Sequence, residues 1–157
     1  MQNPVPPIGV SAPDFTLPST SGQPVTLSAL RGQNVLIAFF PLAFTSTCTE
    51  ELCDMRDDWD QFASRDTLVV PVSVDSTATL KEFRNKYAMR SEFLSDFKRD
   101  VSRLYGVLLE DRFYANRAYF LIDRKGLIRW SHVEANPGQK RTNHELFQHI
   151  LSLVLEG

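Results

Sequence analysis

Two nearly continuous apolar runs limit what this chain can fold into more than any other feature. They are NVLIAFF at 34–40 and TLVVPVSVD at 67–75. A strand this apolar has to be covered on both faces, which is typical of a sheet with helices packed on each side. Pro71 lies inside the second run and predicts a bulge or a sheet edge there, because proline cannot donate to a strand ladder.

The segments around these runs predict helices and further strands. Residues 48–63 are expected to form a helix, because Leu52, Met55, Trp59 and Phe62 recur at helical spacing. The other expected elements are a strand pair at 13–17 and 24–30, helices at 77–89, 101–107 and 142–156, and a hairpin of 117–123 with 127–133. This order predicts one α/β domain over residues 1–157, with a central mixed β-sheet flanked by helices on both faces. A thioredoxin-like fold fits it, and the pattern alone leaves other α/β folds open.

Charge and hydropathy argue against several classes of partner. The net charge of −2 gives no basic surface for nucleic acid or an anionic membrane. No apolar run approaches the roughly 20 residues of a membrane span, and residues 1–15 lack the charged and apolar regions of a secretory signal. We therefore expect a cytoplasmic protein. In that compartment two cysteines are more often catalytic, redox-sensing or metal-binding than structural.

The first cysteine, Cys48, follows the first apolar run at a predicted strand-to-helix junction. Unpaired backbone N–H groups at the start of a helix favour a negative charge, and the thiolate is the reactive form of cysteine. Ser46 or Thr47 is expected to cap this helix. Glu50 and Glu51 are expected in its first turn, where acidic side chains suit the helix dipole. The sequence therefore predicts a reactive thiol at Cys48.

Three residues outside this helix are candidates to assist such a thiol. Thr45 stands three positions before Cys48 and can place a hydroxyl beside the sulfur or beside the substrate oxygen. Pro41 stiffens the intervening loop and can shield the site from water. Arg117 opens an apolar strand, so its head group is expected at a strand end. A guanidinium never loses its proton and presents forked donors, which makes it the best side chain for stabilising charge.

The second cysteine, Cys53, lies five residues after Cys48. Five residues along a helix are about 140° of rotation and roughly 7.5 Å of rise. A disulfide needs Cα atoms within about 7 Å of each other. The two cysteines therefore cannot form a disulfide while the helix is intact, and its first turns must unwind before they can.

A zinc site is the alternative use of these cysteines, because Cys48 and Cys53 together with His144 and His149 give C-x4-C and H-x4-H spacings. The two histidines are about 140° apart on one predicted helix, whereas metal ligands on a helix share one face. The sequence therefore favours surface positions for both, and no metal is expected.

Several linked motifs resemble the peroxiredoxin family. PLAFTSTC at 41–48 matches its signature of Pro, three residues, Thr, two residues and Cys, and Glu51 fits three positions further on. NRAYFLIDRKGLIRW at 116–130, APDFTL at 12–17 and VTLSALRGQNVLIAFFP at 25–41 resemble the same family. The resemblance covers nearly the whole chain.

This resemblance implies a thioredoxin-like fold and thiol-dependent reduction of hydroperoxides, with no cofactor. Cys48 would be the peroxidatic cysteine, and Thr45 and Arg117 would activate it and the peroxide. Pro41 would shield the thiol, and Glu51 would help to orient the arginine. The family also suggests a homodimer built around the active-site loops.

Two branches of the family differ in how oxidised Cys48 would be reduced again, and this chain resembles both. The PLAFT loop and the ANR strand look like the one-cysteine, E-like alkyl hydroperoxide reductases, which would need an external thiol. Cys53 looks like the resolving cysteine of the Q-like group, whose internal disulfide a thioredoxin- or glutaredoxin-like protein would reduce. A peroxide-sensing switch is a rival of another class. A thiol–disulfide oxidoreductase is weakened by the absence of a C-x-x-C pair.

Overall fold

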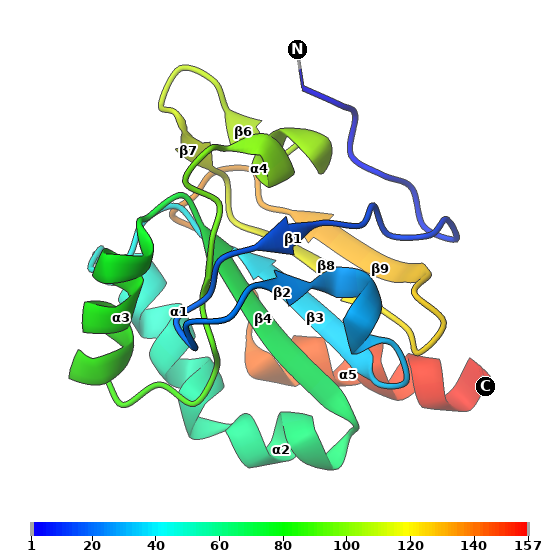
Figure 1. The fold of residues 1–157 in the computed structure, drawn as a ribbon. Helices are drawn as coiled ribbons and strands as arrows, with labels where there is room; N and C mark the ends of the chain where they lie inside the picture. Colours follow the sequence, from blue (N-terminus) through cyan, green and yellow to red (C-terminus); the bar gives the residue numbers. More distant parts are fainter. Residues whose placement is uncertain (1, 157) are drawn as a thin grey trace.

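A five-stranded mixed sheet forms the centre of the computed structural model, which describes residues 2–156 (Figure 1). The strand order is β5 (Leu94–Ser95), β4 (Thr67–Ser73), β3 (Asn34–Phe39), β8 (Ala118–Ile122) and β9 (Ile128–Val133). The β3–β4 and β4–β5 pairs are parallel, whereas β3–β8 and β8–β9 are antiparallel. The predicted mixed α/β sheet, the two apolar strands and the late hairpin are therefore confirmed.

The remaining elements surround this sheet. The helices are α1 (Ser46–Asp57), α2 (Trp59–Ser64), α3 (Thr77–Lys86), α4 (Asp100–Leu104), α5 (Asn143–Glu156) and the 3-10 turn η1 (Leu27–Leu30). Two small antiparallel pairs are formed by β1 (Thr16–Leu17) with β2 (Val25–Thr26), and by β6 (Leu108–Leu109) with β7 (Tyr114–Ala115). Within residues 2–156, no helix is long and apolar enough to cross a bilayer.

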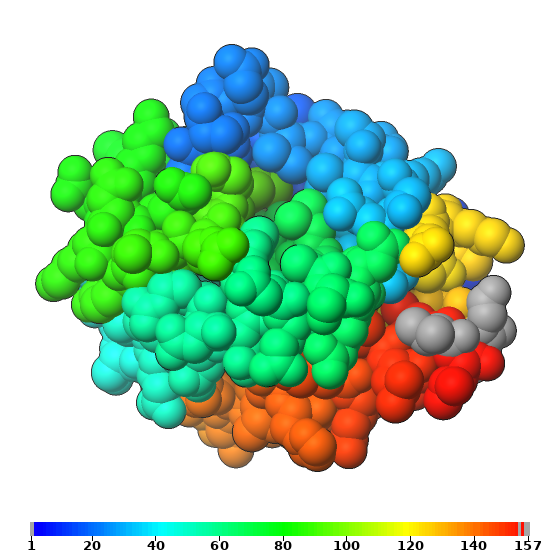
Figure 2. Space-filling model, turned by 90° about the horizontal axis from the view of Figure 1, so that it is seen from below, coloured from blue at the N-terminus to red at the C-terminus, as the bar shows by residue number. Residues whose placement is uncertain are grey.

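Alternation along β3 divides the core into two clusters, one on each face of the sheet. Val35, Ile37 and Phe39 pack with residues of the β1–β2 hairpin, η1 and α4. Leu36 and Ala38 point to the other face, where they pack with residues of α1, α2, α3 and α5. Figure 2 shows α2 and α5 side by side on that second face, where the rings of Phe62 and Phe147 are 4.7 Å apart. Helices therefore cover both faces, as predicted.

The helix predicted at 48–63 is two helices, and its predicted cap is wrong. Asp58 leaves the helical conformation (φ −102°, ψ 16°) and accepts a hydrogen bond from Asn143 Nδ2 at 2.8 Å. The same Asn143 amide donates to the backbone carbonyl oxygen of Asp54 at 2.9 Å, so a tertiary contact lies at the break. The first helix begins at Ser46 with Thr45 as its N-cap residue, in extended conformation and without a side-chain capping bond.

Pro71 lies in an unbroken stretch of β4, so the predicted bulge is wrong. The register with β3 continues through the Pro71–Ala38 pair. On the other side of β4, β5 pairs only with Val72 and Ser73. Beside Pro71 the strand is therefore locally an edge, where a missing N–H group costs little.

Two predicted helix ends need small corrections. The helix expected at 77–89 stops at Lys86, because Ala88 adopts a left-handed conformation (φ 50°). The helix expected at 101–107 ends at Leu104, shortly before Gly106 (φ 69°). A Cβ atom at Gly106 would lie 2.6 Å from the carbonyl oxygen of Asn3, so only glycine lets the N-terminal arm approach here.

Candidate functional site

Cys48 lies in the first turns of α1 and is almost completely buried. The register of β3 with β8 pairs Phe39 with Ala118, which brings the start of β8 to the end of β3 where the loop to α1 begins. Arg117 immediately precedes β8, and its Nη2 donates a hydrogen bond to Cys48 Sγ at 3.0 Å. Both cysteines are free thiols. Residues 69 positions apart in the sequence are thus joined by a direct contact.

Arg117 is the largest fully buried side chain among residues 2–156, and each part of its guanidinium has a partner. Its Nη1 donates to Glu51 Oε1 at 2.7 Å, and Nε and Nη2 donate to the carbonyl oxygen of Pro137 at 3.3 and 3.1 Å. Burial lowers the pKa of Arg117, but the charges of Glu51 and Cys48 outweigh it and raise the pKa overall. The guanidinium is therefore a permanent positive charge held against the sulfur.

Glu51 is buried and is not in the first turn of its helix, so that prediction is wrong. The helix begins at Ser46, two residues before the predicted start, and Glu51 falls in its second turn. There its carboxylate faces Arg117 and accepts a second hydrogen bond from the hydroxyl of Tyr119. Burial raises the pKa of Glu51, and Arg117 and Tyr119 oppose that shift by stabilising the carboxylate.

Pro41 and Thr45, in the loop before α1, differ in their exposure to solvent. Pro41 is buried and follows directly on the apolar run. Thr45 is exposed, and its hydroxyl donates to the carbonyl oxygen of Leu42 at 2.7 Å. Between them Phe44 has a left-handed backbone (φ 69°), which is uncommon for a bulky residue and marks a constrained loop.

Several residues that support this site were not predicted from the sequence. Asp75, just beyond β4, accepts a hydrogen bond from the backbone N–H of Ala43 at 2.8 Å and so fixes the loop. Tyr119 lies on β8, two positions after Arg117, and alternation along the extended chain puts both side chains on the same face. That spacing was the one available clue to Tyr119. Arg141 acts through its backbone N–H, which donates to the Tyr119 hydroxyl at 3.0 Å.

Cys53 lies further along α1, partly buried against the second core cluster. Burial raises the pKa of its thiol, and Asp57 and Asp54 raise it further, against the opposing charge of Arg56. In this structure Cys53 is thus a protonated, partly covered thiol at neutral pH.

The histidines have ordinary surface or aromatic contacts. The ring of His149 stacks on Trp130 at 4.0 Å, and Gln148 bonds His144 at 3.2 Å. His132 bonds Glu134 at 3.0 Å. Within the described part of the chain, no three His, Cys, Asp or Glu side chains gather in a way that could hold a metal ion.

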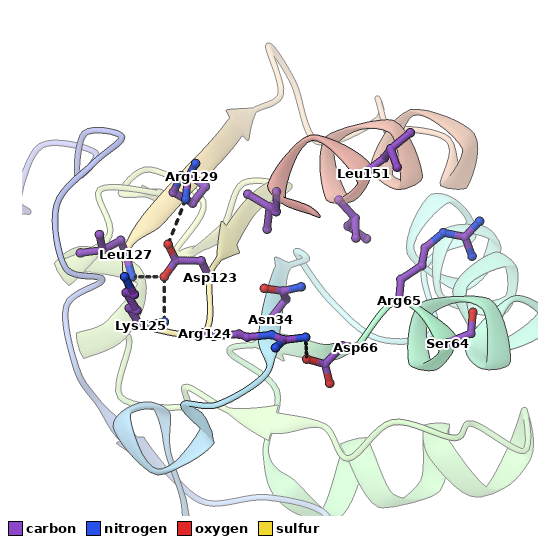
Figure 3. Close-up of a pocket in the computed structure, with 12 residues that line it drawn as sticks. Asn34, Ser64, Arg65, Asp66, Asp123, Arg124, Lys125, Leu127, Arg129 and Leu151 are labelled. Carbon is purple, nitrogen blue, oxygen red and sulfur yellow. Dashed lines mark hydrogen bonds and ion pairs between the residues drawn. The ribbon is translucent and has the colours of Figure 1, made fainter. Parts of the chain in front are cut away.

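A cavity of about 670 Å³, shown in Figure 3, has none of Cys48, Glu51 and Arg117 in its lining. Asn34 at the start of β3 and Asp123 after β8 line it, so it opens at the end of the sheet opposite to Cys48. Four of its charged side chains form two ion pairs, Arg124 with Asp66 at 2.7 Å and Arg129 with Asp123 at 3.2 Å. We therefore assign the chemistry to the buried thiol rather than to this cavity.

A buried thiol under a fixed guanidinium on a thioredoxin-like sheet is typical of thiol-dependent peroxidases. Residues 8–131 match the AhpC/TSA family. The chain is 41% identical to alkyl hydroperoxide reductase E of Mycobacterium tuberculosis (strain ATCC 25618 / H37Rv) over 137 residues, which is 85% of this chain and 89% of the relative. A putative peroxiredoxin bcp of Coxiella burnetii is 35% identical over 77% of this chain and 84% of its own.

Among solved structures, the reduced 2-Cys peroxiredoxin of Plasmodium vivax superposes with a TM-score of 0.86 at 27% identity. That match covers 93% of this chain and 81% of the other. The chain thus belongs to the AhpC/TSA family. It is a peroxiredoxin, that is, a thiol-dependent peroxidase, and it combines similarity to the E-like and the Q-like relatives as the motifs predicted.

Proposed function

We propose that the peroxidase acts on hydrogen peroxide and organic hydroperoxides through Cys48. The observation that carries this assignment is the 3.0 Å contact between Arg117 Nη2 and Cys48 Sγ inside a buried site. The positive charge favours the thiolate, which is the nucleophilic form of cysteine. Two hydrogen bonds to the Pro137 carbonyl and the ion pair with Glu51 keep the guanidinium from turning away.

The first chemical step needs only this cluster and the substrate. The Cys48 thiolate attacks one peroxide oxygen, the S–O bond forms and the O–O bond breaks. The leaving oxygen takes a proton and departs as water or an alcohol, and Cys48 becomes a sulfenic acid. Arg117 stabilises the negative charge that develops on the leaving oxygen. Thr45 gives up its bond to the Leu42 carbonyl to donate to the peroxide, and Pro41 limits access of water.

Cys53 is the proposed resolving cysteine. Its thiol condenses with the Cys48 sulfenic acid, which forms a disulfide and releases water. About 7.5 Å of helical rise separates the two residues, so α1 must unwind first. The break at Asp58 makes this easier, since α1 is a 12-residue helix rather than part of one long helix. Helices of that length are marginal on their own. A thioredoxin- or glutaredoxin-like protein then reduces the disulfide.

Intact mass and a free-thiol count after one equivalent of hydrogen peroxide test this proposal. Loss of two hydrogens and of both thiols in a single chain would support the internal disulfide. Gain of one oxygen with Cys53 still free would mean a one-cysteine enzyme that awaits an external thiol. An unchanged mass would contradict the role of Cys48.

Cys53→Ser is expected to leave the first oxidation fast and to accumulate the Cys48 sulfenic acid. Serine keeps the size of the side chain but cannot form the disulfide. The accumulated product is measured as one added oxygen by intact mass, with the wild-type protein oxidised in parallel. Recycling of this variant at the wild-type rate by the same protein reductant would contradict a resolving role for Cys53.

Disulfide formation is expected to accelerate as the pH rises between about pH 6 and pH 9, because the raised pKa of Cys53 leaves little of its thiolate at neutral pH. The measurement is the rate at which the disulfide appears after oxidation, in samples quenched with acid and weighed intact. A rate independent of pH would show that unwinding of α1, and not ionisation of Cys53, limits this step.

We also infer a single-domain, cytoplasmic homodimer in which the active-site loops face the partner copy. Large aromatic side chains are exposed in three loops of the molecule, Phe44, Phe97 and Phe113 at 45%, 60% and 49%. Phe44 belongs to the loop between Pro41 and Cys48. Exposed apolar side chains of this size favour an interface. Light scattering measures the mass in solution, and a monomer at all concentrations would contradict the dimer.

A further inference from the structure

The hydroxyl group of Tyr119 joins two segments that meet at the active site. It donates a hydrogen bond to Glu51 Oε2 of α1, and it accepts one from the backbone N–H of Arg141 at 3.0 Å. Tyr119 is fully buried in the same core cluster as Cys48. Three hydrogen bonds in series thus join the Tyr119 hydroxyl to the sulfur, through Glu51 and Arg117.

The Tyr119 hydroxyl keeps its proton and directs it toward Glu51 as a hydrogen-bond donor. Burial raises the pKa of Tyr119, and so does the neighbouring carboxylate of Glu51. The phenol therefore stays protonated and remains a donor. Because the Arg141 N–H already occupies the oxygen as a donor, the phenol proton is directed toward the carboxylate.

The two carboxylate oxygens of Glu51 then accept hydrogen bonds from different partners. Oε1 accepts from Arg117 Nη1 at 2.7 Å, and Oε2 accepts from Tyr119. This arrangement leaves Nη2 of the guanidinium free to point at Cys48 Sγ. Arginine and carboxylate groups readily form forked pairs with two parallel bonds. Without the phenol, the unpaired oxygen of Glu51 would compete for Nη2 and draw it from the sulfur.

The segment after β9 contacts both Arg117 and Tyr119. Residues 134–141 follow β9, and Pro137 within them accepts two bonds from Arg117. The Arg141 side chain bonds the buried carboxylate of Glu134 at 2.9 and 3.1 Å. Glu134 is itself fixed, since its backbone N–H donates to the Arg117 carbonyl at 3.0 Å. The anchor that holds Tyr119 in place is therefore rigid.

We propose that Tyr119 is a positioning residue for peroxide reduction, whose hydroxyl holds Glu51 so that Arg117 stays directed at Cys48. The inference rests on the proposed roles of Cys48 and Arg117. Tyr119 does not touch the reacting sulfur. It acts on the charge that stabilises the leaving oxygen.

Tyr119→Phe tests this role, because it removes the hydroxyl and leaves the buried ring in place. We expect the rate constant for oxidation of Cys48 by hydrogen peroxide to fall about tenfold, which corresponds to ~1.4 kcal/mol in the barrier. Alkylation of Cys48 by iodoacetamide also uses the thiolate but has no leaving peroxide oxygen. Its rate is expected to fall less than the oxidation rate, because moving Nη2 away from the sulfur disfavours the thiolate in both reactions but weakens the stabilisation of a leaving oxygen only in the oxidation. Both rates are measured in a Cys53→Ser background, so that one thiol reacts.

The matched control is Tyr105→Phe. Tyr105 is also fully buried and its hydroxyl donates to the Pro13 carbonyl at 2.6 Å, but it lies in the other core cluster. This control is expected to lose similar stability while both rate constants stay unchanged. A Tyr119→Phe oxidation rate within about twofold of wild type, or an equal fall in oxidation and alkylation, would overturn the inference. A parent protein that peroxide does not oxidise at all would instead contradict the proposed function.

Discussion

Replacing Cys48 by serine is expected to abolish peroxide consumption. The buried side chain keeps its size and can still accept the hydrogen bond from Arg117, so the fold should persist. A serine hydroxyl is not ionised at neutral pH and has no base beside it in this cluster, so it cannot attack the O–O bond. The loss should be complete rather than partial. The measurement is consumption of hydrogen peroxide with dithiothreitol as an artificial reductant.

A melting curve of the Cys48→Ser protein separates lost chemistry from lost structure. A native-like melting temperature with no turnover would support the assignment of Cys48. Turnover comparable with wild type in the variant would mean that Cys53 or a different group performs the first step. A slow oxidation of the wild type that never turns over with any thiol would instead fit the peroxide-sensing alternative.

The central fold was predictable because its strands are unusually apolar. The runs at 34–40 and 67–75 become β3 and β4, each covered on both faces. The late hairpin followed from the Arg-Lys-Gly turn between 117–123 and 127–133. The break at Asp58 was not predictable from periodicity, since Trp59 and Phe62 continue the apolar spacing. At the break Asn143 donates to the Asp58 carboxylate and to the Asp54 carbonyl, and no local pattern reveals these tertiary contacts.

The candidate site was predictable only in part. Cys48, Arg117 and Glu51 were found through their motif, and the structure joins them directly. Tyr119 was missed because an aromatic residue in the run AYFLI looks like one more core residue. The contribution of Arg141 is a backbone N–H group and has no signature in its side chain. The Thr45 hydroxyl was expected beside the sulfur or the substrate oxygen, and in this structure it bonds the carbonyl of Leu42.

Arg117→Lys is expected to slow the oxidation of Cys48 about a hundredfold, although the positive charge is retained. The guanidinium contacts three different partners at once, namely Cys48 Sγ, Glu51 Oε1 and the Pro137 carbonyl. A single ammonium group on a flexible chain cannot span these three positions with the same geometry. It should settle on the carboxylate of Glu51, which already accepts the shortest of the hydrogen bonds from Arg117. The rate constant is measured by stopped-flow fluorescence against hydrogen peroxide concentration.

The control is Arg84→Lys, which makes the same exchange away from the thiol. Arg84 bonds the Ser91 carbonyl at 2.9 Å and pairs with Glu92 at 3.1 Å on the surface of α3. Its oxidation rate should match that of wild type. If Arg117→Lys also reacted at the wild-type rate, a nearby positive charge alone would be sufficient and the fixed fork would be unnecessary. In that case the contacts of Glu51, Tyr119 and Pro137 would contribute to folding and not to the reaction. Their proposed effect on the reaction is to hold the forked guanidinium in one orientation.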